Sequence, residues 1–134
     1  PYMFGNTHPI LEMKRFNSEF ILNGITILPI YQKHGKDFSY GFRFGNLAYL
    51  TDLNTITDDA YTKLVGIDTL IIDCLRYSYA STHLNLEETI CAILKIKPRL
   101  SILTHMSHNI EYESIKKILP NNVIAAHDGM EIVC

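Results

Sequence analysis

The sequence predicts an α/β (α+β) fold in which a mixed sheet is covered by helices. Residues 20–51 contain apolar runs separated by Asn-Gly and Gly-Asn pairs, which is typical of antiparallel hairpins. After residue 57, helical patterns alternate with short apolar runs, which indicates right-handed parallel crossovers. With 134 residues and 47% apolar content, the chain is one domain or less and can bury a core.

The first third of the chain is expected to form antiparallel sheet. Residues 1–18 have no clean period and are predicted to be an irregular leading segment. Asn23-Gly24 predicts one hairpin, whose second strand continues to His34. Gly45-Asn46 predicts a second hairpin, whose last strand ends at Asp52.

Three helices are predicted from their caps and apolar spacing. Thr57 is the expected N-cap of the first, which ends at Gly66, and Asn85 with Glu88 forms a capping-box pair before the second. The third is predicted over 111–119 and ends before Pro120. The side chains expected to face the core are Ala60, Tyr61, Leu64 and Val65, then Leu86, Ile90, Ile93 and Leu94, and finally Tyr112, Ile115, Ile118 and Leu119.

Apolar strands are predicted over 47–51, 68–73, 100–104 and 123–126, with a short closing strand over 130–133. Each of the first four is followed by, or ends in, an acid or imidazole: Asp52, Asp73, His105 and His127-Asp128. Parallel neighbouring strands would bring these groups to one edge, where histidine and carboxylate suit a divalent metal. His34, Asp52 and His105 are the candidate ligands; a hydrogen-bonded structural role is the alternative for each.

Composition excludes several classes of function. The net charge is −2 and the charges are dispersed, so binding of nucleic acid through backbone electrostatics is not expected. Three cysteines without a C-x-x-C pair predict reduced thiols in a cytoplasmic protein. No apolar run approaches the ~18 residues of a membrane span.

Several motifs together resemble the C-terminal half of the metallo-β-lactamase superfamily, and most closely its phosphoribosyl cyclic phosphate phosphodiesterase branch. The resemblance covers about residues 25–132. The motifs are His34-Gly35, Tyr49-Leu50-Thr51-Asp52, Ile71-Ile72-Asp73-Cys74-Leu75-Arg76, Thr82-His83, Leu103-Thr104-His105-Met106-Ser107-His108 and Asp128-Gly129-Met130.

This resemblance implies half or more of an αββα sandwich, a mixed sheet with helices on one face, and two divalent metals, zinc or manganese. The position matching His34 would bind one metal, that of Asp52 would bridge both, and that of His105 would bind the second. His83 would be the catalytic group that protonates the departing alkoxide, which suits an imidazole. A solvated loop histidine is the alternative for His83.

Four further residues are expected near this site. His108, Asp73 and Asp128 match positions that orient ligating imidazoles, with turn and capping chemistry as the alternative. Arg76 would hold a phosphate oxygen, with a surface ion pair as the alternative.

The family's His-x-His-x-Asp-His string is absent from the 134 residues. The chain alone is therefore expected to bind metal weakly and to hydrolyse little. It is expected to be a partial domain of a longer protein, since it begins at Pro1, or else a degenerate relative; an uncovered apolar face would favour a homodimer. The expected activity is hydrolysis of a small phosphodiester, cyclic or nucleotide-like. The alternatives are a non-catalytic nucleotide-binding or assembly module and an RNA-processing nuclease.

Overall fold

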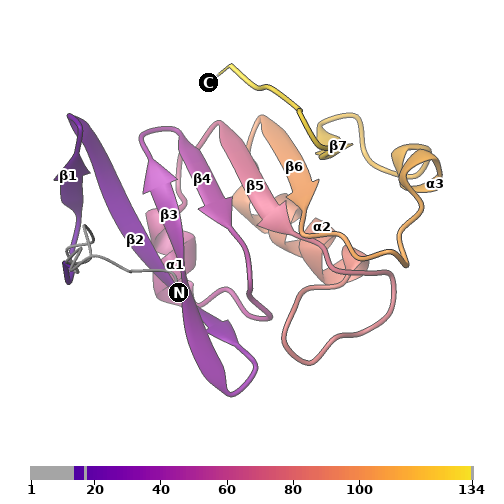
Figure 1. Ribbon diagram of the computed structural model, residues 1–134, viewed down its shortest axis with the longest axis horizontal. Helices are drawn as coiled ribbons and strands as arrows, with labels where there is room; N and C mark the ends of the chain where they lie inside the picture. Colours follow the sequence, from indigo (N-terminus) through magenta and orange to yellow (C-terminus); the bar gives the residue numbers. More distant parts are fainter. Residues whose placement is uncertain (1–13, 17, 134) are drawn as a thin grey trace, which may run out of the picture.

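The computed structural model describes residues 14–16 and 18–133, which form a seven-stranded mixed sheet and three helices (Figure 1). The α/β fold class and the sheet with helices on one face are confirmed. The strands are β1 (Phe20–Leu22), β2 (Ile25–His34), β3 (Asp37–Phe44), β4 (Leu47–Leu50), β5 (Thr69–Asp73), β6 (Leu100–Thr104) and β7 (Val123–Ala125). The helices are α1 (Asp58–Lys63), α2 (Leu86–Ile96) and α3 (Tyr112–Lys116).

The strands lie side by side in chain order, from β1 at one edge to β7 at the other (Figure 1). β1 to β4 are antiparallel neighbours, and β4 to β7 are parallel neighbours. Both predicted hairpins are present: Asn23 and Gly24 have φ of 49° and 81°, and Gly45 has φ of 59°. Such positive values are accessible to glycine and tolerated by asparagine, which is why these pairs close the turns.

The first two helices begin where their caps predict. The Thr57 hydroxyl accepts a hydrogen bond from the Ala60 amide at 3.2 Å. Asn85 and Glu88 form the reciprocal capping box, with both side-chain contacts at 2.9 Å. None of the helices in the described ranges is long and apolar enough to span a bilayer.

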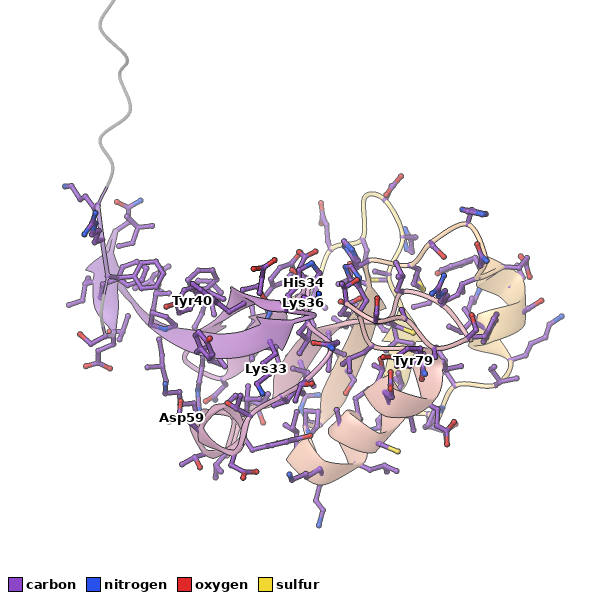
Figure 2. All side chains as sticks on the ribbon, turned by 90° about the horizontal axis from the view of Figure 1, so that it is seen from below. Lys33, His34, Lys36, Tyr40, Asp59 and Tyr79 are labelled. Carbon is purple, nitrogen blue, oxygen red and sulfur yellow. The ribbon has the colours of Figure 1, made fainter. Side chains whose placement is uncertain are left out.

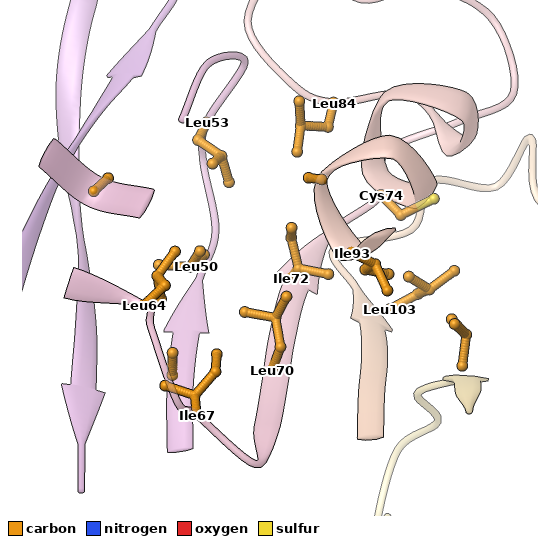
Figure 3. Packing of buried hydrophobic residues seen from close by; sticks show 14 of the residues in the cluster. Leu50, Leu53, Leu64, Ile67, Leu70, Ile72, Cys74, Leu84, Ile93 and Leu103 are labelled. Carbon is orange, nitrogen blue, oxygen red and sulfur yellow. The ribbon is translucent and has the colours of Figure 1, made fainter. Parts of the chain in front are cut away.

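The core lies between the sheet and helices α1 and α2, which cover the same face (Figure 2). Figure 3 shows Leu50, Leu70 and Ile72 of the sheet packed toward Leu64, just after α1, and Ile93 of α2. All five side chains are buried. Burying these apolar side chains stabilises the packing of the strands that carry the predicted site residues.

The opposite face of the sheet carries aromatic side chains that none of the three described helices covers (Figure 2). Tyr31 stacks on Phe38 with ring centroids 5.2 Å apart, and Tyr40 lies edge-on to Tyr31 at 5.9 Å. Phe38 is 57% exposed, and Tyr31, Tyr40 and Tyr49 are each more than 40% exposed. We call Tyr31, Phe38, Tyr40 and Tyr49 the open aromatic face.

Some element predictions were wrong. Residues 130–133 form no strand, and α3 covers only Tyr112–Lys116 of the predicted 111–119. Val65, Leu94 and Ile118 are exposed rather than packed, at 71%, 65% and 61%. The short α3 leaves Ile118 beyond its last turn, while Val65 follows the C-cap of α1 and so leaves its apolar face. Most of the leading segment predicted over 1–18, namely residues 1–13 and 17, lies outside the described residues, as does Cys134.

Candidate metal centre

The candidate site lies at one edge of the sheet, where the strands carrying the predicted ligands end. β4, β5 and β6 run parallel toward this edge, and the tip of the β2–β3 hairpin reaches it too (Figure 1). His34 is the last residue of β2, Asp52 follows β4 by two residues, and His105 directly follows β6. His83 comes from the loop between β5 and α2. The predicted convergence at one edge is therefore present.

Asp52 and His105 both adopt the left-handed backbone region, with φ of 56° and 60°. This conformation disfavours residues other than glycine, although Asp, Asn and His tolerate it best. It turns the chain out of each strand at the edge. Strained backbone of this kind is often found at functional sites, because the surrounding structure must hold it in place.

The side chains of the four residues meet around the Asp52 carboxylate. Asp52 Oδ1 lies 3.4 Å from His83 Nε2 and 3.7 Å from His105 Nε2. The His83 ring stacks on His105 with centroids 4.9 Å apart and lies edge-on to His34 at 4.8 Å. Figure 2 shows His34 on the side of the sheet opposite α1. Three imidazoles thus surround one carboxylate.

The loop before α2 sets the orientation of two of these imidazoles. His34 Nδ1 lies 2.8 Å from the Thr82 carbonyl oxygen, so it donates and Nε2 is left as the lone-pair nitrogen. His83 Nδ1 contacts the Thr82 hydroxyl at 2.8 Å. A Cβ on Gly35 would lie 2.9 Å from the Thr82 side chain, so glycine permits this close approach. Hydrogen bonds of this kind fix the tautomer of a metal-binding histidine.

The donor set fits a divalent cation. One ligand atom each from His34, Asp52 and His83 lie within 4.8 Å of one another, and neutral imidazole with carboxylate is the set that zinc and manganese accept. This trio contains His83, which we predicted as a proton donor, in place of His105, which we predicted as a ligand. His105 approaches the same Asp52 oxygen, so both assignments stay predictions.

Asp73, at the end of β5, lies behind the site. Its side chain is fully buried, and Oδ2 accepts a hydrogen bond from the Leu53 amide at 3.2 Å, while Oδ1 has no partner in the described part of the chain. Burial raises the pKa of the Asp73 carboxyl to about 6, although the Leu53 hydrogen bond, His83 and His105 partly offset that rise. Its contact is with the loop that follows Asp52, so it supports that loop.

The other expected neighbours behave differently. His108 and Asp128 are exposed, and within the described chain neither side chain has a hydrogen bond to His34, His83 or His105. Arg76 donates to the Tyr79 carbonyl at 2.8 Å and makes no ion pair among the described residues. Arg76 therefore holds its own loop together and does not form the predicted surface ion pair among the described residues, while its contact with a phosphate oxygen stays a prediction.

Sequence reasoning missed the residues that tie down the loop after β4. Asn54 Oδ1 accepts from the Gly35 amide at 3.0 Å, and its Nδ2 donates to the Ser81 carbonyl at 3.0 Å. Gln32 and Ser39 hold the same loop from β2 and β3. The available signal was polar residues at inward-facing strand positions, where apolar ones are usual.

Comparison with known proteins agrees with this arrangement. A solved diphosphatase of the PhnP family superposes with a TM-score of 0.87 at 33% identity, covering 90% of this chain and 47% of that one. The metallo-beta-lactamase fold protein YhfI from Bacillus subtilis superposes with a TM-score of 0.71 at 18% identity, covering 85% of this chain and 52% of that one. The second likeness concerns the fold alone.

A curated octanoyltransferase from Porphyromonas gingivalis is 29% identical over 129 residues, which are 93% of this chain and 26% of that protein. The chain thus spans about a quarter of this relative and about half of the two solved structures. Residues 2–106 match the family described as the beta-lactamase superfamily domain. Because this match covers most of the sequence, the chain belongs to that family.

Proposed function

We propose that this chain carries part of the active site of a dinuclear metal-dependent hydrolase that cleaves a small phosphodiester, cyclic or nucleotide-like. The convergence of His34, His83 and His105 on Asp52 supports it most directly. The PhnP-family neighbour is a diphosphatase, so hydrolysis at phosphorus has a precedent in a relative 33% identical to this chain. We also propose that the protein belongs to the phosphoribosyl cyclic phosphate phosphodiesterase branch, which its sequence motifs resemble.

His34, Asp52 and His105 would hold two divalent cations, zinc or manganese, with Asp52 between them. Bound metal of this kind supplies hydroxide at neutral pH and neutralises charge on phosphate oxygens. His83 Nε2 faces the Asp52 carboxylate, so it lies where it can hold a proton near a leaving oxygen. The remaining ligands would come from protein outside these 134 residues.

We do not propose octanoyl transfer for this chain, because the chain matches only about a quarter of the Porphyromonas octanoyltransferase. Small substrates fit better than RNA, because the net charge is −2 and the charges form no basic stripe. The free thiols of Cys74 and Cys91 are consistent with a cytoplasmic, reducing location.

The role of His83 separates the two possible assignments of the site. In the natural full-length protein with Mn²⁺, we expect His105→Ala to weaken metal binding about tenfold or more and to abolish turnover. We expect His83→Ala to leave the Mn²⁺ affinity unchanged and to slow cleavage of a cyclic alkyl phosphodiester about a hundredfold or more. The measurements are Mn²⁺ titration followed by electron paramagnetic resonance, and steady-state hydrolysis.

The leaving group provides the internal control. Nitrophenolate departs without a proton, so His83→Ala should affect bis(p-nitrophenyl) phosphate much less than the alkyl ester. Leu94→Ala, which truncates an exposed side chain of α2 outside the cluster, should change neither measurement. If His83→Ala instead abolishes metal binding, His83 is a ligand and its proposed role is wrong. If the wild-type protein binds no metal, the chain is better explained as a non-catalytic module.

A further inference from the structure

We propose that Gln32 and Ser39 are positioning residues, whose relay of hydrogen bonds holds Asp52 in the backbone conformation that presents its carboxylate to the cation. This inference rests on the function proposed above, since it concerns the residue expected to bridge the metals. Both side chains act on backbone carbonyls, those of Thr51 and Asp52, rather than on the side chains of the cluster.

The relay runs across three strands toward the site. Gln32 and Ser39 are directly paired in the β2–β3 register. Gln32 Nε2 donates to the Thr51 carbonyl at 2.5 Å and to the Ser39 hydroxyl at 3.0 Å. The Ser39 hydroxyl in turn donates a hydrogen bond to the Asp52 carbonyl at 2.6 Å. The two consecutive carbonyls that lead from β4 into the site are therefore both fixed by this pair.

These bonds act at the point where the backbone is least favourable. Asp52 has φ of 56°, a left-handed conformation that is unfavourable for a residue with a side chain. The Leu53 amide is held separately by Asp73. Without the relay, the Thr51 and Asp52 carbonyls lose the donors that hold them, and Asp52 can return to the extended region that L-residues prefer. Its carboxylate would then leave the three imidazoles.

Gln32 is an unusual choice for the core, which supports a specific role. It is 1% exposed, and its buried Oε1 has no hydrogen-bond partner among the described residues. The amide cannot be turned around, because both groups facing Nε2, the Thr51 carbonyl and a hydroxyl that already donates to Asp52, must accept. A buried unpaired oxygen is unfavourable for folding, so stability alone would favour an apolar side chain at this position.

The test compares Ser39→Ala and Gln32→Met with matched controls. Ser39→Thr keeps the hydroxyl, and Ser101→Ala removes a buried strand hydroxyl that has no hydrogen-bond partner. We expect Ser39→Ala and Gln32→Met to weaken Mn²⁺ binding about tenfold or more. Ser39→Thr and Ser101→Ala should bind Mn²⁺ as the wild type does. Mn²⁺ alone is the probe. It is titrated into the natural full-length protein and its variants, and binding is followed by electron paramagnetic resonance.

A second readout needs no metal. The backbone chemical shifts and the HN–Hα coupling of Asp52, measured by NMR in the metal-free protein, report its φ directly. We expect the left-handed signature in wild type and Ser39→Thr, and its loss in Ser39→Ala and Gln32→Met. An unchanged Asp52 signature in both of these variants overturns the inference, whether or not metal binds. Failure of the wild-type protein to bind Mn²⁺ would instead contradict the proposed function, and the NMR comparison would still decide the relay.

Discussion

Asp73 links the fold to the site through a single buried carboxyl. Its pKa is raised to about 6, so the folded protein holds this proton more tightly than the unfolded chain does. The protonated Asp73 carboxyl therefore stabilises the fold. This contribution is fully present below pH 3.8, the pKa of the group in the unfolded chain, and it is lost as the pH rises through about 6. Metal-free protein should therefore lose stability over this interval, by about 3 kcal/mol from this group.

Asp73→Asn should remove that dependence, because the amide stays neutral and its oxygen can still accept from Leu53. The measurement is urea unfolding of chelator-treated protein at several pH values between about 4 and 7, compared between wild type and variant. Asp128→Asn, which changes an exposed carboxyl, is the control. Parallel stability curves for wild type and Asp73→Asn would show that Asp73 does not titrate in this range.

At the level of elements, the β3–β4 packing depends on a glycine. Gly41 pairs with Ile30, and a Cβ there would lie 2.9 Å from the Tyr49 carbonyl and 3.0 Å from Gln32 Oε1, and closer still to the Leu50 side chain. Gly41→Ala should therefore destabilise the fold by about 1–3 kcal/mol, measured by urea unfolding. Leu50→Val shortens the side chain in the way, so the double variant should be less destabilised than the sum of the single changes. Strict additivity would contradict this explanation.

Elements set by local chemistry could be predicted from the sequence. The turn at Asn23-Gly24, the Thr57 cap and the Asn85–Glu88 box each depend on residues a few positions apart, and all are present. The edge of the sheet that gathers Asp52 and His105 was also predictable, because each ends a strand in a parallel array. Turns, helix caps and strand ends could therefore be predicted from residues close together in the sequence.

Features set by distant contacts could not be predicted. Leu94 fits the helical period of α2, yet it is 65% exposed, because among the described residues nothing buries that side of the helix. Ser39 in β3 reads as a polar position in an alternating strand, and only the fold reveals that its hydroxyl meets the Asp52 carbonyl. The proximity of His83 to Asp52 likewise depends on the path of a loop, which spacing alone does not determine.

At the scale of the whole molecule, one face of the sheet is covered by α1 and α2 and the other is the open aromatic face (Figure 2). Exposed aromatic side chains that touch one another are typical of surfaces that bind another protein surface. The net charge of −2 offers little repulsion between copies. The 134-residue chain is therefore expected to associate with itself, as a homodimer through this face.

Sedimentation velocity of the 134-residue chain tests this expectation. Phe38→Lys places a charge in the open aromatic face and should shift the chain toward monomer, because burying an unpaired ammonium is strongly unfavourable. Leu94→Lys, at a comparably exposed apolar residue on the helix side, should leave the association unchanged. Far-ultraviolet circular dichroism checks that both variants keep the fold. A wild-type chain that stays monomeric on concentration, or equal effects of the two substitutions, would show that the open aromatic face does not drive association.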